Sequence, residues 1–82
     1  MIHRVAIVEW GPGDGIAKTF QNELSKLGYE TELFNFVNAI PKNIDMVLSF
    51  APYGKLLPIV SQMKSYAIDV RPIFVHWNTE NP

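Results

Sequence analysis

The sequence predicts an α/β domain of three layers, in which an open, all-parallel sheet of four strands carries helices on both faces, as in Rossmann-like or flavodoxin-like proteins. Short apolar runs without in–out alternation are typical of parallel strands buried on both faces. Segments with apolar residues at helical spacing lie between the first and second runs and between the third and fourth runs. The predicted order is therefore strand, helix, strand, strand, helix, strand. Right-handed crossovers around a central first strand then give the spatial order 2-1-3-4.

The first predicted strand is Val5–Val8, four consecutive apolar residues. A loop with three glycines follows, from Gly11 to Gly15, and a helix begins at Gly15 or Ile16 with Asp14 as its N-cap. Gly28 is placed where a left-handed residue ends a helix. The residues expected on the sheet-facing side of this helix are Ile16, Ala17, Phe20, Leu24 and Leu27.

The second predicted strand runs from Glu30 to Phe34 or Phe36. It alternates polar and apolar residues, which favours an outer position in the sheet. The segment 37–43 is too short for a crossover helix, and we expect coil or a single turn there. The third strand, Ile44–Phe50, is almost wholly apolar and belongs near the centre of the sheet.

A second helix is predicted from about Lys55 to Ala67, with Pro58 tolerated because it lies in the first turn near Leu56. Its expected core residues are Leu56, Ile59, Val60, Met63 and Ala67. The fourth strand, Ile73–Trp77, is apolar on both faces although it forms an edge, where charge or proline normally prevents further pairing. It is either a simple hydrophobic edge, or a strand that self-associates, or one that a longer protein covers.

Composition narrows the classes of function. The chain has 82 residues, 48 % hydrophobic and 18 % charged, with a net charge of −1, which is typical of one small globular domain. Its lysines and arginines form no basic stripe, so no nucleic-acid partner is expected. The absence of cysteine excludes disulfides and thiolate metal sites. No apolar run approaches the roughly 20 residues of a membrane span, and no signal peptide is recognised, so we expect a cytoplasmic protein.

Three loops are expected to converge at the carboxyl ends of the first, third and fourth strands, where open α/β sheets bind ligands. Backbone amides of the glycine loop and the start of the first helix favour a negatively charged group there. A purely structural tight turn remains an equal alternative for the glycine loop. The residues predicted to bind a ligand are Trp10, Gly11, Gly13, Asp14, Gly15, Tyr53, Asn78 and Glu80.

Several well-known kinds of site do not fit the sequence. The third glycine of the loop comes one residue too early for the dinucleotide fingerprint, and Asn35 near the end of the second strand replaces the expected acid. His3 and His76 lie at opposite ends of their strands, so no metal site and no cofactor are expected. A receiver domain needs an aspartate at the end of the third strand, where Ser49 stands, and the loop from Glu9 onward lacks the histidine of a cobalamin-binding motif.

Over essentially its whole length the chain resembles the N-terminal domain of a two-domain, GT-B fold glycosyltransferase of a family-1-like or CgeB-like kind. The features that carry the resemblance are the buried first strand with its glycine-rich turn, Leu27–Glu30 at the end of the first helix, Ile44–Leu48 in the third strand, and the final segment Phe74–Pro82. The resemblance implies the acceptor-side domain of an enzyme that transfers a sugar from a nucleotide-sugar donor to a sugar or other acceptor.

That resemblance further implies that most of the donor site lies on a C-terminal domain, so that the chain alone would be inactive. The lack of an Asp-x-Asp motif agrees with metal-independent transfer. The alternative is a non-catalytic flavodoxin-like domain that binds a small anion or a nucleotide.

Overall fold

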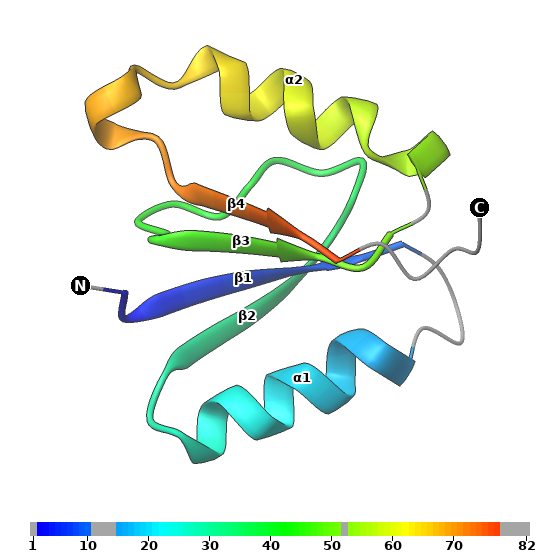
Figure 1. The fold of residues 1–82 in the computed structure, drawn as a ribbon, viewed down its shortest axis with the longest axis vertical. Helices are drawn as coiled ribbons and strands as arrows, with labels where there is room; N and C mark the ends of the chain where they lie inside the picture. The colour runs from blue at the N-terminus through cyan, green and yellow to red at the C-terminus, as the bar shows by residue number, and fades with distance from the viewer. Residues whose placement is uncertain (1, 11–14, 52, 78–82) are drawn as a thin grey trace.

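The computed structural model describes residues 2–10, 15–51 and 53–77, with the side chain of Tyr53 left aside. These residues form a four-stranded sheet with one helix on each face (Figure 1). The elements are β1 (Arg4–Glu9), α1 (Gly15–Lys26), β2 (Glu30–Asn35), β3 (Met46–Ser49), the 3₁₀ turn η1 (Tyr53–Lys55), α2 (Leu57–Ser65), the 3₁₀ turn η2 (Ile68–Val70) and β4 (Ile73–His76).

The sheet is entirely parallel, and its strand order is β2-β1-β3-β4. Ile7 in the middle of β1 lies between Leu33 of β2 and Leu48 of β3. In Figure 1, α1 lies on one side of the sheet and α2 on the other. The predicted fold class and strand order are therefore confirmed.

Strand β1 is the centre of the core, because all four residues from Val5 to Val8 have no exposed surface. Val5 and Ile7 point towards α1, where they pack with Ala17. Ala6 and Val8 point towards α2 and belong to the larger cluster. That cluster also contains Phe34, Ile40, Ile44, Val47, Ala51, Ile59 and Met63.

The turn after α1 and the connection after β2 follow the sequence prediction. Gly28 has φ +96°, the left-handed conformation that ends the helix at little steric cost. Residues 36–45 contain no helix. Gln62 of α2 holds this connection in place, because its Oε1 accepts a hydrogen bond from the Ile40 amide and its Nε2 donates to the Asn38 carbonyl.

Several predicted boundaries are wrong. Strand β1 is Arg4–Glu9 rather than Val5–Val8, β3 ends at Ser49 rather than Phe50, and β4 ends at His76 rather than Trp77. Strand β3 begins at Met46 rather than Ile44, although Ile44 is still buried in the larger cluster. Helix α2 ends at Ser65 rather than Ala67, because Tyr66 already has extended backbone angles (φ −78°, ψ 144°) and Ala67 is exposed. Pro58 lies in the first turn of α2, as expected.

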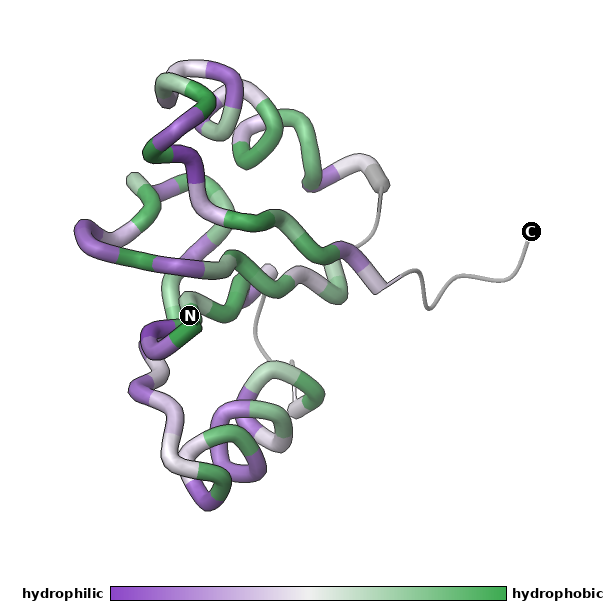
Figure 2. The backbone as a smooth tube through the Cα atoms, turned by 60° about the vertical axis from the view of Figure 1, so that its left-hand side comes forward, coloured by the Kyte–Doolittle hydropathy of each residue, from purple (hydrophilic) through white to green (hydrophobic). Residues whose placement is uncertain are grey.

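The predicted apolar side of α1 is only partly covered by the sheet. Ala17 is fully buried and Leu24 half-buried, whereas Ile16, Phe20 and Leu27 are 43 %, 41 % and 74 % exposed. The reason is that α1 lies mainly against β2 and β1, so one side of its apolar stripe extends beyond the strands it covers. Figure 2 shows α1 as turns that alternate between hydrophilic and hydrophobic residues.

Strand β4 differs from the prediction in a similar way. It occupies the edge, as expected, but its two faces are not equivalent. Phe74 is half-buried against the larger cluster on the α2 side. Ile73 and Val75 lie on the α1 side, where α1 does not reach, and are 54 % and 37 % exposed.

The amino ends of the strands are joined by one carboxylate. Asp45 Oδ2 accepts hydrogen bonds from the amides of His3 (2.8 Å) and Arg4 (2.9 Å). These two donors stabilise the ionised form and lower the pKa of Asp45 below its ordinary value. The side chain thus ties the start of β1 to the residue that precedes β3.

We predict that replacing Ile7 by alanine lowers the free energy of unfolding by about 2–5 kcal/mol, because it removes buried methyl groups from the most enclosed strand. Chemical denaturation measures the change. Val37→Ala is the control, because Val37 is 65 % exposed and its truncation should change stability by less than about 0.5 kcal/mol. An Ile7→Ala midpoint as little altered as the control's would contradict the central position of β1.

We predict that the Asp45 hydrogen bonds make stability pH-dependent in acid. Because the folded-state pKa is lowered, the stabilisation is present above the unfolded pKa of about 3.9 and is lost as the pH falls through the folded value. Asp45→Asn should lower the melting temperature at pH 7 and bring it closer to wild type at pH 2–3. A difference in melting temperature that stays constant from pH 7 to pH 2 would contradict this role.

Candidate functional site

The predicted ligand-binding residues fall into two groups. Trp10, Gly15 and Tyr53 are described: Trp10 follows β1, Gly15 is the first residue of α1 and Tyr53 begins η1 after β3. All three positions lie at the carboxyl edge of the sheet, as expected. The others lie outside the described residues, and they are Gly11, Gly13, Asp14, Asn78 and Glu80.

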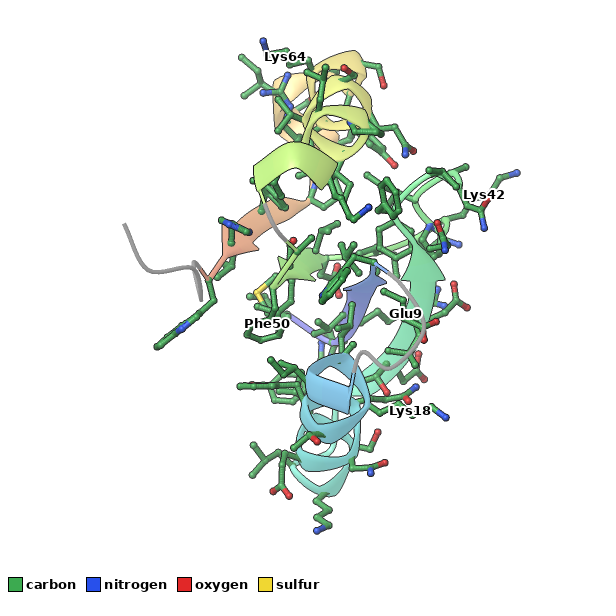
Figure 3. All side chains as sticks on the ribbon, turned by 90° about the vertical axis from the view of Figure 1, so that its right-hand side faces the viewer. Glu9, Lys18, Lys42, Phe50 and Lys64 are labelled. Atoms are coloured by element: carbon green, nitrogen blue, oxygen red, sulfur yellow. The ribbon has the colours of Figure 1, made fainter. Side chains whose placement is uncertain are left out.

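This edge contains the switch point of the sheet. β1 lies between β2 and β3, and the chain leaves β1 towards α1 on one face and leaves β3 towards α2 on the other. The connections after these two strands therefore lead to opposite faces, which is the arrangement in which open α/β sheets bind ligands. Figure 3 looks at this edge, with Glu9 and Phe50 on opposite sides of the end of β1 and α1 below.

The two residues at the end of β1 have different surroundings. Glu9 follows the alternation of Val5 and Ile7, which places it on the α1 side, and it is half-buried. Trp10 packs against the larger cluster on the α2 side. The Trp10 side chain is therefore partly buried on the α2 side of the sheet. The Glu9 carboxylate lies on the opposite side, where α1 begins.

The start of α1 provides main-chain donors at the same edge. The first amides of a helix have no carbonyl partner within it, and the helix dipole favours a negative group beside them. A Cβ added to Gly15 would meet no atom within 4 Å, so the backbone is open to approach there. The Thr19 hydroxyl donates to the Gly15 carbonyl (2.8 Å) and therefore points back along the helix.

Lys55 was missed as a site residue by the sequence analysis, which assigned it only to the start of the second helix. It belongs to η1, and its Nζ lies 4.8 Å from the centroid of the Phe36 ring. Phe36 follows β2 and packs against the larger cluster. This cation–π contact holds a positive charge over the carboxyl edge. In the sequence, Lys55 is only a lysine in the segment that follows a buried strand, and nothing there indicates the contact with Phe36.

Ser49 and His76 form a second feature of this edge that the sequence did not reveal. They are register partners at the ends of β3 and β4, and His76 Nδ1 lies 3.3 Å from Ser49 Oγ. Ser49 is fully buried, and its Oγ also accepts a hydrogen bond from the Ala51 amide (3.2 Å). Either atom can be the donor in this contact, because the role of Nδ1 depends on the tautomer of the imidazole ring.

Metal-binding and membrane-spanning features were also sought among the described residues. There, no group of three or more His, Asp or Glu side chains is arranged to hold a metal ion. None of the described helices has the length and apolar character needed to cross a membrane.

Two hollows lie away from the switch point. One, of about 260 Å³, is lined by Arg4, Val5 and Glu30 together with residues 31, 32 and 44. The other, of about 330 Å³, lies between the connection 41–44 and the segment around Tyr66 and Pro72. Both contain residues from the amino end of the sheet. Neither contains a residue of the candidate site.

Comparison with known proteins adds no family to this geometry. The sequence matches no protein-family model, and no curated protein matches it. No relative therefore assigns a role to the residues at the carboxyl edge, and their roles follow from their positions and chemistry.

We predict that Ser49→Ala destabilises the domain by about 1–3 kcal/mol, because it leaves the buried Ala51 amide without its acceptor. It should also remove the contact with His76 Nδ1, which would change the ¹⁵N chemical shift of that ring nitrogen. Ser65→Ala is the matched control, since the Ser65 hydroxyl donates to the Gln62 carbonyl at an exposed position. Equal stability losses in the two variants would contradict the importance of the Ser49 hydrogen bonds.

Proposed function

We propose that the chain is the acceptor-side domain of a GT-B glycosyltransferase, and that the edge between β1 and β3 binds the phosphate-bearing part of a nucleotide-sugar together with the acceptor. The observation that carries the proposal is the switch point, where β1 and β3 send their chains to opposite faces of the sheet. The resemblance of Leu27–Glu30, Ile44–Leu48 and Phe74–Pro82 to this family selects the class of ligand.

The charges at the edge favour an anionic ligand. The start of α1 supplies amides on one side, and Lys55 supplies a positive charge on the other. The Glu9 carboxylate between them disfavours an anion in direct contact with β1. We therefore place phosphate groups against the start of α1 and leave Glu9 to accept hydrogen bonds from hydroxyl groups of a sugar acceptor.

The proposal assigns no catalytic residue, metal ion or cofactor to the chain. In such an enzyme the remaining half of the donor site belongs to a C-terminal domain, so this chain by itself should bind weakly and transfer no sugar. A cytoplasmic location, where the donor would be met, belongs to the same proposal.

A second candidate is a non-catalytic domain that binds a nucleotide or small anion. The pairing of Lys55 with Phe36 favours it, because a positive charge over an aromatic ring needs no second domain to attract a phosphate group. The two candidates differ in their response to sugars. An acceptor-side domain should recognise a sugar without any nucleotide, whereas an anion-binding domain should not.

We predict that a nucleoside diphosphate binds with millimolar affinity and first shifts the amide NMR signals of Gly11, Gly13, Gly15 and Tyr53. Lys55→Gln should weaken binding at least threefold, because it removes the positive charge from the edge. Lys64→Gln is the matched control, an exposed lysine near the far end of α2.

Two outcomes decide between the candidates. Simple sugars that shift the same amides support the acceptor-side domain, whereas a response to nucleotide or inorganic phosphate alone supports the anion-binding domain. Shifts that cluster around Asp45 and Asp69, at the opposite edge of the sheet, would contradict both.

A further inference from the structure

An uncovered apolar surface lies on the α1 side of the sheet, away from the candidate site. Its sheet part comes from alternate residues of β4 and the residue that follows. Ile73 and Val75 pair in register with Met46 and Leu48, which belong to the core cluster beneath α1. They therefore share that face of the sheet. Trp77 continues the alternation, with its amide donating to the Ser49 carbonyl (2.8 Å), and is 63 % exposed.

The helix part of the surface comes from one side of α1. Ile16, Phe20 and Leu27 are spaced by four and seven residues, so they form one row along the helix. The Phe20 ring lies 4.4 Å from that of Phe50, between centroids, which shows that this row faces β3 and β4 rather than β2. Glu23 in the same row forms an ion pair with Lys26 (3.5 Å).

Together these residues form a step. The sheet is covered by α1 over β2 and β1 and is left open over β4, as the arrangement of the ribbons in Figure 3 also shows. The height of the step is the thickness of one helix, about 10–12 Å, which is close to the roughly 10 Å between two packed sheets. We name this the step surface, and its residues are Ile16, Phe20, Leu27, Ile73, Val75 and Trp77.

We propose that the step surface joins two copies of the chain in a two-fold symmetric dimer. The step height is close to the distance between two packed sheets. The sheet of the second copy therefore fits against the open face of β4, in the same layer as α1 of the first copy. The edge of its β4 then lies beside α1 of the first copy, and the reverse contact forms by symmetry. The two-fold axis lies between the two sheets and runs parallel to the strands. An axis perpendicular to the strands would place α1 of each copy in the same space as the partner's sheet.

Area and charge support a second copy as the occupant. From their exposed fractions, the six residues leave roughly 700 Å² open, close to the about 800 Å² that each partner contributes to a standard interface. None of the six carries a charge, and Glu23 in the α1 row is already paired with Lys26, so the surface is suited to meet its own copy. By contrast, the other edge of the sheet, β2, carries the exposed acids Glu30 and Glu32, which oppose pairing with a copy.

The proposed dimer also explains two departures from the sequence prediction. Leu27 follows a helical apolar pattern yet is 74 % exposed, and β4 lacks the charges that usually protect an edge. In the dimer, the partner's β4 covers Leu27, and α1 covers the edge of the partner's β4. The sequence led us to expect self-association through the fourth strand, and the open face of that strand is the α1 side, because Phe74 on the other side is half-buried against the larger cluster.

Sedimentation equilibrium of the full chain tests the proposal. We expect a reversible dimer with a dissociation constant of about 10–100 μM, in keeping with the modest interface area. Leu27→Lys should raise this constant at least tenfold, because it places a charge beside the partner's β4. Leu57→Lys is the matched control, because Leu57 is 72 % exposed on α2 at the opposite face and should leave the constant unchanged. Circular dichroism confirms that each variant is folded.

A mixing experiment tests the geometry. Leu27 and Ile73 both lie towards the amino ends of the strands, so the axis brings Leu27 of one copy beside Ile73 of the other. Leu27→Glu and Ile73→Lys should each be monomeric alone and should associate when mixed. A wild-type chain that remains monomeric at about 1 mM would overturn the dimer and leave the surface to a different partner. A control variant that dissociates as much as Leu27→Lys, or a mixture that stays monomeric, would overturn the proposed contacts.

Discussion

The complete burial of β1 is the constraint on which the rest of the structure depends. Four consecutive residues without exposed surface need a strand on each side and a helix over each face. β2 and β3 provide the sides, and α1 and α2 provide the faces. Because consecutive side chains point to opposite faces, the same four residues divide the core into two clusters, one under each helix.

The candidate site follows from the same constraint. A central first strand forces its neighbours to be reached by crossovers on opposite faces, so the chain must part at the carboxyl edge between β1 and β3. The start of α1 and Lys55 then lie at that edge, where Glu9 is the last residue of β1 and Lys55 lies over the Phe36 ring. Ser49 and His76 fasten the ends of β3 and β4 beside it. Among the described residues, α1 is the helix on its face of the sheet and does not extend over β4, which is the origin of the step surface.

Patterns of a few neighbouring residues were sufficient for most of the fold. The unbroken apolar run of Val5–Val8, the alternation in β2 and the position of Gly28 are local features, and each was interpreted correctly. The boundaries were less predictable, because distant groups compete for the same residues. Asp45 lies just before β3 although its backbone still bonds to Arg4 and Ile73, and Ala67 follows the helical pattern although the helix has already ended.

The sequence by itself determined the order of elements, the central place of β1 and the position of the switch point, because apolar periodicity and chain handedness fix these features. Only the tertiary structure decided which side of α1 the sheet covers, which face of β4 is open, and that Lys55 approaches Phe36 and Ser49 approaches His76. These depend on the register and lateral position of elements far apart in the chain. Local sequence patterns carry no information on how far a helix extends across its sheet.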